Sequence, residues 1–196
     1  MHYSGILQRL DRKNPSFTLI ELLIVVAIIG ILAALIIVSI TSASAKARDV
    51  KRQEDLKNIQ KALEMYYTAN GSYPVTNASG VSWQGNCSGY GSHPVSGSNG
   101  YVPNLAPTYI PSLPIDPRQT ITHDGTYSAA ACYLYSSNGT DYKIIAYETV
   151  ETVIPTQTNA LADFWDPGRG LGSVGYDQGD PGNASYALFT PGAKYW

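Results

Sequence analysis

The sequence has 196 residues and a formal net charge of −2, and only 14% of its residues are charged while 11% are aromatic. This length suits one domain, or one domain with an appendage. Residues 71–196 carry more acidic than basic side chains, which argues against a nucleic-acid-binding surface in that part of the chain.

The first notable element is an apolar segment that follows a short basic one. Residues 1–16 carry three cations against a single acid, and residues 17–40 read FTLIELLIVVAIIGILAALIIVSI. As a helix this segment spans roughly 36 Å, enough for the hydrocarbon core of a bilayer, about 30 Å. It is too long for the apolar part of a secretory signal peptide, and no small-x-small cleavage site follows it. We therefore expect a transmembrane helix over residues 17–40.

The charges beside this segment bear on its orientation. Basic residues before it favour a cytoplasmic N-terminus and an exported remainder, because cytoplasmic flanks are rich in Lys and Arg. Cations between residues 46 and 52 weaken this argument from the other side. We interpret that second run of charge as a solvated face and use it only for orientation.

Glu21 is the one charged residue inside the apolar segment. A carboxylate in a membrane helix costs roughly 2.5–3.5 kcal/mol on insertion scales and is a functional hypothesis by default. Two structural readings compete with it. The side chain can extend to the lipid headgroups, or it can pair with the amine of Phe17 one turn away if the chain is cut before that residue.

The run from Phe17 to Glu21 (FTLIE), followed by apolar residues 22–37, resembles the N-terminal signature of type IV prepilins and type II secretion pseudopilins. The resemblance implies a leader (residues 1–16), cleavage between Ser16 and Phe17 by a prepilin peptidase, and N-methylation of Phe17. It also implies that the Glu21 carboxylate meets the Phe17 amine of a neighbouring subunit. Ser16 stands where the family usually has glycine, and Val38 stands where it often has proline.

The helix is expected to continue beyond the apolar segment as an amphipathic half over residues 41–70. Apolar residues recur at spacings of three and four from Leu56 to Tyr66, while lysines lie on the opposite face. Asn70-Gly71 supplies a left-handed cap, and Pro74 prevents the helix from resuming.

The remainder, residues 71–196, reads as an exported head of loops and strands. Residues 71–110 are loop-like, and the proline-rich residues 109–117 form an extended connector against the helix. We expect three strands, namely Ala131–Ser136, Tyr142–Thr149 and Tyr186–Thr190, the first two joined by an Asn138-Gly139 turn. The LPIDP connector and this hairpin also resemble the pilin core. The predicted fold class is therefore α+β and pilin-like: one long N-terminal helix packed on a small antiparallel sheet.

Cys87 and Cys132 both lie in this head. If the head is outside the cytoplasm, a disulfide is the simplest interpretation. It would close a loop of about 45 residues and constrain the unfolded chain by about 4 kcal/mol. Two free buried thiols are the alternative.

A late glycine-rich stretch, residues 163–182, offers hard oxygen ligands that suit calcium, and some related pseudopilins bind calcium in a late loop. Plain aspartate-glycine turns are the competing reading. The candidate ligands are Asp163, Asp166, Asp177 and Asp180. No HExxH, P-loop or GxSxG pattern occurs, so we expect no enzyme activity.

These observations predict a structural subunit of a type IV pilus-like filament, anchored in the inner membrane before assembly and in a cell-surface or periplasmic filament afterwards. The implied partners are further copies, related pilins, prepilin peptidase, and an inner-membrane assembly platform with a cytoplasmic ATPase. A type II secretion pseudopilin or a minor pilin is the alternative within the family. A monomeric, single-pass anchored adhesive module is the alternative outside it.

Overall fold

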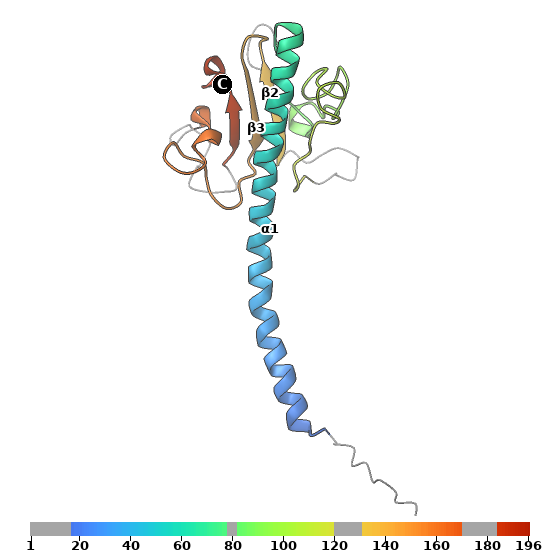
Figure 1. The fold of residues 1–196 in the computed structure, drawn as a ribbon, viewed down its shortest axis with the longest axis vertical. Coiled ribbons are helices and arrows are strands. Elements are labelled where there is room, and N and C mark those ends of the chain that lie inside the picture. The colour runs from blue at the N-terminus through green and yellow to red at the C-terminus, as the bar shows by residue number, and fades with distance from the viewer. Residues whose placement is uncertain (1–16, 78–81, 120–130, 170–183) are drawn as a thin grey trace, which may run out of the picture. The chain divides into compact units, whose positions relative to one another are not determined.

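The computed structural model describes residues 17–77, 82–119, 131–169 and 184–196, with the side chains of residues 35–39 left out (Figure 1). The chain divides into two compact units, residues 1–41 and 42–196. Each unit is described by itself.

Helix α1 runs over Leu19–Asn70. It ends as its sequence predicts, because Gly71 adopts a left-handed conformation (φ 74°) and donates its N–H to the carbonyl of Tyr67 at 2.8 Å. Pro74 follows three residues later and prevents continuation.

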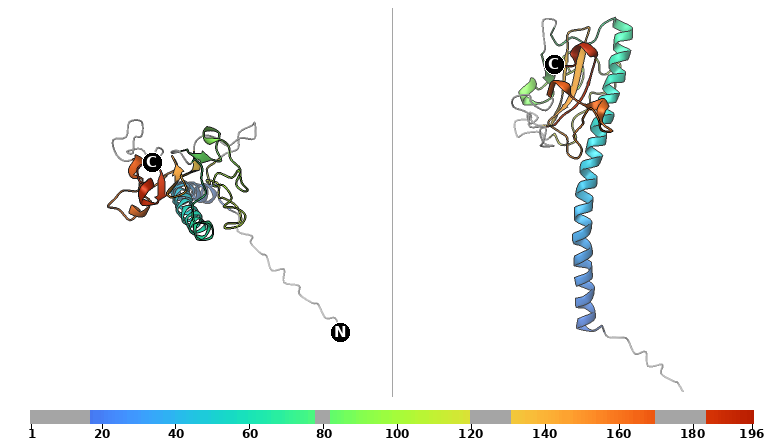
Figure 2. Two further views of the ribbon diagram at one scale, coloured as in Figure 1. Left: turned by 90° about the horizontal axis from the view of Figure 1, so that it is seen from above. Right: turned by 90° about the vertical axis from the view of Figure 1, so that its left-hand side faces the viewer.

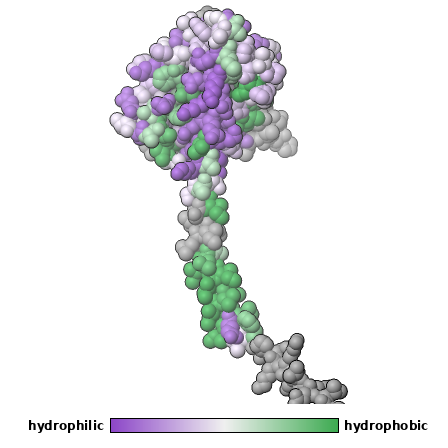
Figure 3. Space-filling model, viewed as in Figure 1, coloured by the Kyte–Doolittle hydropathy of each residue, from purple (hydrophilic) through white to green (hydrophobic). Residues whose placement is uncertain are grey.

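The part of α1 in the first unit exposes apolar side chains on all sides. Every described residue from Phe17 to Leu32 with a large apolar side chain is more than two-fifths exposed, with Leu19 at 81% and Val25 at 44%. Figure 3 shows this surface as a continuous hydrophobic stretch. Within the described ranges, no helix meets the combined length and hydropathy expected of a membrane span.

The second unit contains a four-stranded antiparallel sheet in the order β1-β2-β3-β4. The strands are β1 (Gln84–Gly85), β2 (Cys132–Ser137), β3 (Tyr142–Tyr147) and β4 (Tyr186–Phe189). Leu134 of β2 lies opposite Ile145 of β3, which in turn lies opposite Ala187 of β4. Together with α1 this sheet confirms the predicted α+β, pilin-like layout.

The strand boundaries differ from the prediction at two residues with positive φ. Ala131 (φ 59°) lies before β2 and Glu148 (φ 51°) lies after β3, so neither residue is extended and both leave the ladder. The short strand β1 was not predicted at all, because a two-residue strand has no periodicity to detect.

The turn between β2 and β3 has the predicted chemistry. Gly139 adopts φ 96°, and the side-chain carbonyl of Asn138 accepts hydrogen bonds from the N–H groups of Thr140 (3.0 Å) and Asp141 (2.8 Å). Asparagine and glycine thus supply the local hydrogen bonds and the positive φ that the turn needs.

Both faces of the sheet are buried. One face packs on the second half of α1, as the two views in Figure 2 show, and the opposite face is covered by residues 83–90 and their neighbours. Alternate residues of β2 serve the two faces, with Tyr133 toward the helix and Leu134 away from it. The helix contributes Leu56, Ile59, Ala62 and Leu63 to the core.

The disulfide between Cys87 and Cys132 is present and joins the segment before η1 (Ser88–Tyr90) to the start of β2. Both cysteines are fully buried in the cluster on the outer face of the sheet. The bond therefore ties the covering segment to the strand that it covers.

Replacing both Cys87 and Cys132 by serine is expected to lower the free energy of unfolding of the head by about 4 kcal/mol, because the oxidised loop of 45 residues no longer restricts the unfolded chain. Denaturant unfolding in detergent, followed by the fluorescence of the three tryptophans, measures this loss. A reductant should destabilise the wild type by a similar amount and leave the variant unchanged. Equal stability of the two oxidised proteins would contradict the prediction.

Candidate assembly site

The N-terminal end of α1 is closed by a reciprocal pair of side chains. Thr18 donates its backbone N–H and its hydroxyl to Oε2 of Glu21, at 2.9 and 2.7 Å. The backbone N–H of Glu21 in turn donates to the hydroxyl oxygen of Thr18 at 3.3 Å. This arrangement is a capping box, which satisfies N–H groups that a helix start leaves unpaired.

The capping box uses only one of the two carboxylate oxygens. Oε1 of Glu21 makes no hydrogen bond within the described part of the chain, whereas Oε2 accepts two. Phe17, just before the box, is 76% exposed. The geometry thus leaves one oxygen open beside an exposed residue, while Ser16 of the predicted cleavage site lies outside the described residues.

The sequence contained a signal for this box that the analysis above did not use. A threonine followed three residues later by glutamate, directly before an apolar run, is the capping-box pattern. Glu21 was weighed only as a charge in lipid, although Thr18-x-x-Glu21 predicts that its own helix terminus holds it.

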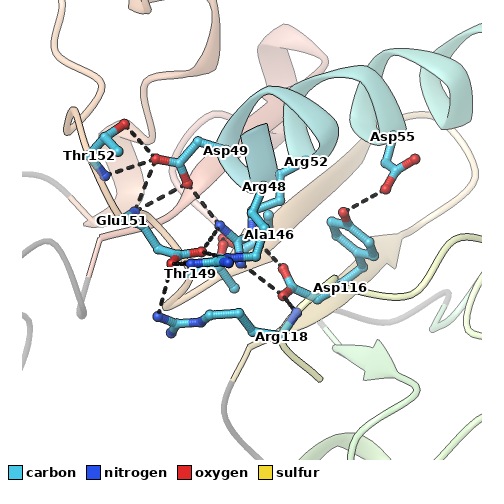
Figure 4. A network of polar contacts seen from close by, with 11 residues as sticks. Arg48, Asp49, Arg52, Asp55, Asp116, Arg118, Ala146, Thr149, Glu151 and Thr152 are labelled. Atoms are coloured by element: carbon cyan, nitrogen blue, oxygen red, sulfur yellow. Dashed lines mark hydrogen bonds and ion pairs between the residues drawn. The ribbon is translucent and has the colours of Figure 1, made fainter. Parts of the chain in front are cut away.

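A second polar constellation lies where α1 meets the head, and Figure 4 shows it. Arg52, which is fully buried, binds both carboxylate oxygens of Asp116, with Nε–Oδ2 at 2.7 Å and Nη2–Oδ1 at 3.0 Å. Its Nη1 donates to Asp49 at 2.8 Å and to Glu151 at 2.7 Å. One guanidinium therefore joins the helix, the connector and the segment after β3.

Glu151 is the second centre of this network. Besides Arg52, it accepts hydrogen bonds from Arg48 of α1, and Arg118 lies 3.6 Å away. Its backbone N–H and that of Thr152 donate to Asp49, at 3.1 and 2.8 Å. Three arginines and three acids thus balance in charge, as buried ions require.

The electrostatics keep both centres ionised. Burial alone would lower the pKa of Arg52, but hydrogen bonds to Asp116 and Glu151 raise it above its ordinary value. Burial alone would raise the pKa of Glu151, but hydrogen bonds from Arg48 and Arg52 outweigh it and lower the pKa from 4.5 to about 2. The network is charged at any physiological pH.

The interpretation of residues 46–52 as a solvated face was wrong for Asp49 and Arg52, whose exposed fractions are 2% and 0%. The buried stripe of α1 does not begin at Leu56 but extends backwards through these two residues at spacings of four and three. The period was visible in the sequence. The missing information was that Asp116 and Glu151, distant in sequence, supply the opposite charges.

The predicted calcium ligands are only partly described. Asp177 and Asp180 lie outside the described residues, Asp163 is exposed, and Asp166 is buried with its Oδ1 at 2.6 Å from Nζ of Lys143. Among the described residues, no three His, Cys, Asp or Glu side chains are grouped to hold a metal ion. The calcium site stays a prediction.

Comparisons with known proteins agree with the N-terminal geometry. A family model described as the prokaryotic N-terminal methylation motif matches residues 11–43. The type II secretion system core protein G of Pseudomonas aeruginosa is 43% identical over 65 residues, which cover 33% of this chain and 46% of that protein. The type IV wide pilus major component PilA4 of Thermus thermophilus is 44% identical over 71 residues, which cover 36% and 54%. No solved structure matches the chain.

The long helix, the small sheet and the methylation motif define an α+β protein whose N-terminus is of the processed and methylated type. The motif and these relatives place the chain in the type IV pilin and type II secretion pseudopilin family. Members of this family are structural proteins that are membrane-anchored before assembly. The chain spans about half the length of the relatives that it matches.

Arg52→Met is expected to lower the free energy of unfolding of the head by about 3–5 kcal/mol, because three buried acids lose their shared partner. Tryptophan fluorescence during denaturation in detergent measures the head without interference from the apolar half of α1. Lys61→Met, which removes the same charge from an exposed position of the helix, should change stability by less than about 0.5 kcal/mol. Similar effects of both substitutions would contradict a special role for the network.

The head should lose stability as the pH falls from about 4.5 to about 2, because Glu151 binds a proton in the unfolded chain at a higher pH than in the folded one. Glu151→Gln should be less stable than the wild type at neutral pH and should show a shallower loss over this interval. Unfolding curves at several pH values measure both slopes, with Glu54→Gln, an exposed position on α1, as the matched control. Parallel slopes for the wild type and Glu151→Gln would refute the assignment.

Proposed function

We propose that this protein is a structural subunit of a type IV pilus-like filament, which prepilin peptidase cleaves before Phe17 and which polymerises through its N-terminal helix. The observation that carries the proposal is the fully exposed apolar surface of the described residues 17–34, interrupted by the single charge of Glu21. Such a surface needs lipid or other protein around it. The match of the methylation motif to residues 11–43 supports the same conclusion.

The proposed pairing during assembly uses the open oxygen of Glu21. Cleavage before Phe17 creates a new amine, and an amine and a carboxylate that are each costly in an apolar environment compensate one another when they meet. The capping box leaves Oε1 available for the amine of an adjoining copy. An apolar helix surface then packs against copies of itself, and the ion pair selects the register.

The proposed course begins in the inner membrane, where residues 17–40 anchor the subunit in lipid and the head lies outside the cytoplasm. The buried disulfide fits such an oxidising location. Assembly then places the subunit in a periplasmic or cell-surface filament. The partners are further copies, related pilins, prepilin peptidase, and an inner-membrane platform with a cytoplasmic ATPase.

A pseudopilin of a type II secretion system is the second candidate. Relatives named type II secretion system core protein G, including that of Escherichia coli at 38% identity over 69 residues, favour it. Electron micrographs discriminate the two: long surface filaments built mainly from this chain indicate a major pilin. A secretion defect after deletion of the gene, without surface filaments, indicates a pseudopilin.

Glu21→Ala is expected to leave the protein in the membrane but to lower its incorporation into filaments severalfold, because the amine of the adjoining copy loses its partner. Sheared filaments and membranes are quantified separately by immunoblot. Glu54→Ala is the matched control, since it removes the same charge from an exposed position of α1 in the head. Its filament yield should equal that of the wild type.

The mass of the N-terminal peptide from the same membranes tests processing. A peptide that begins at Phe17 with an added methyl group supports the proposal. A peptide that begins at Met1, with normal yield from Glu21→Ala, would replace it with the monomeric anchored adhesive module.

A further inference from the structure

A small apolar cavity lies between α1 and the segment that follows β3. Its volume is about 260 Å³, below the about 300–1,000 Å³ typical of sites for small molecules. Two valines at its rim, Val50 of α1 and Val153, are 45% and 52% exposed. The cavity therefore suits one or two protein side chains better than a larger ligand.

The wall of this cavity carries two polar donors that the head does not use. The hydroxyl of Tyr186, a residue with no exposed surface, makes no hydrogen bond within the described ranges, although Gln53 and Asp49 lie beside it. Lys46 is exposed and forms no ion pair with any described residue. A buried hydroxyl without a partner costs about 1–3 kcal/mol, so both groups favour an occupant that brings an acceptor.

The complementary composition occurs in this chain itself. Residues 17–34 are apolar and exposed, and their single charged group is the Glu21 carboxylate, whose Oε1 is open. The spacing also matches: Val25 follows Glu21 by four residues, and Val50 follows Lys46 by four. In two helices that run in the same direction, Glu21 therefore faces Lys46 while Val25 faces Val50.

We propose that this cavity is the acceptor for the N-terminal helix of another copy, with Glu21 of that copy paired to Lys46 and Val25 inserted beside Val50 and Val153. The inference rests on the proposed filament function, which gives all copies the same direction. Contact between two different surfaces of identical copies leaves one of each surface free at the ends, so the chain of contacts stays open and forms a filament.

Cross-linking tests the contact in filaments made by the full chain. The variant Val25→Cys with Val153→Cys, treated with a short thiol-reactive cross-linker, should give a ladder of covalent dimers and higher multimers under denaturing conditions. The matched control pairs Val25→Cys with Val75→Cys, which is as exposed as Val25 (44%) but lies beyond the end of α1. It should give monomers.

A charge reversal tests the ion pair. Lys46→Glu places two carboxylates together and should lower filament yield by about tenfold. Lys61→Glu makes the same change at an exposed position of α1 away from the cavity and should leave the yield unchanged.

The outcomes separate the two proposals. A ladder confined to the cavity pair, with loss of filaments only for Lys46→Glu, supports the contact. Wild-type filaments without a ladder, and with normal yield for Lys46→Glu, overturn the contact and leave the filament function standing. Absence of wild-type filaments overturns both. A fatty acid or anionic lipid extracted from washed filaments in equal amount to the subunit also overturns the contact, because that molecule then fills the cavity.

Discussion

Arg52 is the side chain on which the joining of helix and head depends. It is fully buried, and it binds three acids that come from α1, from the connector before the sheet and from the segment after β3. A buried cation is tolerable only when its charge and its donors are all matched, so the three segments must meet in one arrangement. The apolar contacts of Leu56 and Ile59 with the sheet stabilise the head, whereas the arginine determines which segments lie beside them.

The same helix meets two different environments along its length. In its first part the described side chains are apolar and exposed, and the methylation motif covers them. In its second part a stripe of alternating polar and apolar residues is buried against the sheet. The first part is conserved in kind among relatives that match only a third of this chain. The assembly chemistry thus resides in the shared part, and the remaining residues are free to specialise.

Much of this layout followed from the sequence because its signals are local. The length and apolar run of residues 17–40, the Asn70-Gly71 stop and the Asn138-Gly139 turn each depend on neighbouring residues, and the fold class followed from them. The network around Arg52 did not, because its partners Asp116 and Glu151 are 64 and 99 residues away and only the folded chain brings them together. The strand ends were misplaced at residues whose positive φ has no reliable sequence signal.

The capping box at Thr18 and Glu21 has a consequence for how readily a second cation binds. A free glutamate side chain gives up rotamer freedom worth about 1.5–2 kcal/mol when it is immobilised. Here the start of the helix has already fixed the carboxylate through Oε2, so an arriving ammonium group meets a rigid acceptor and little further entropy is lost. The threonine thus acts as a local brace that prepares the acid for its encounter before any other subunit is near.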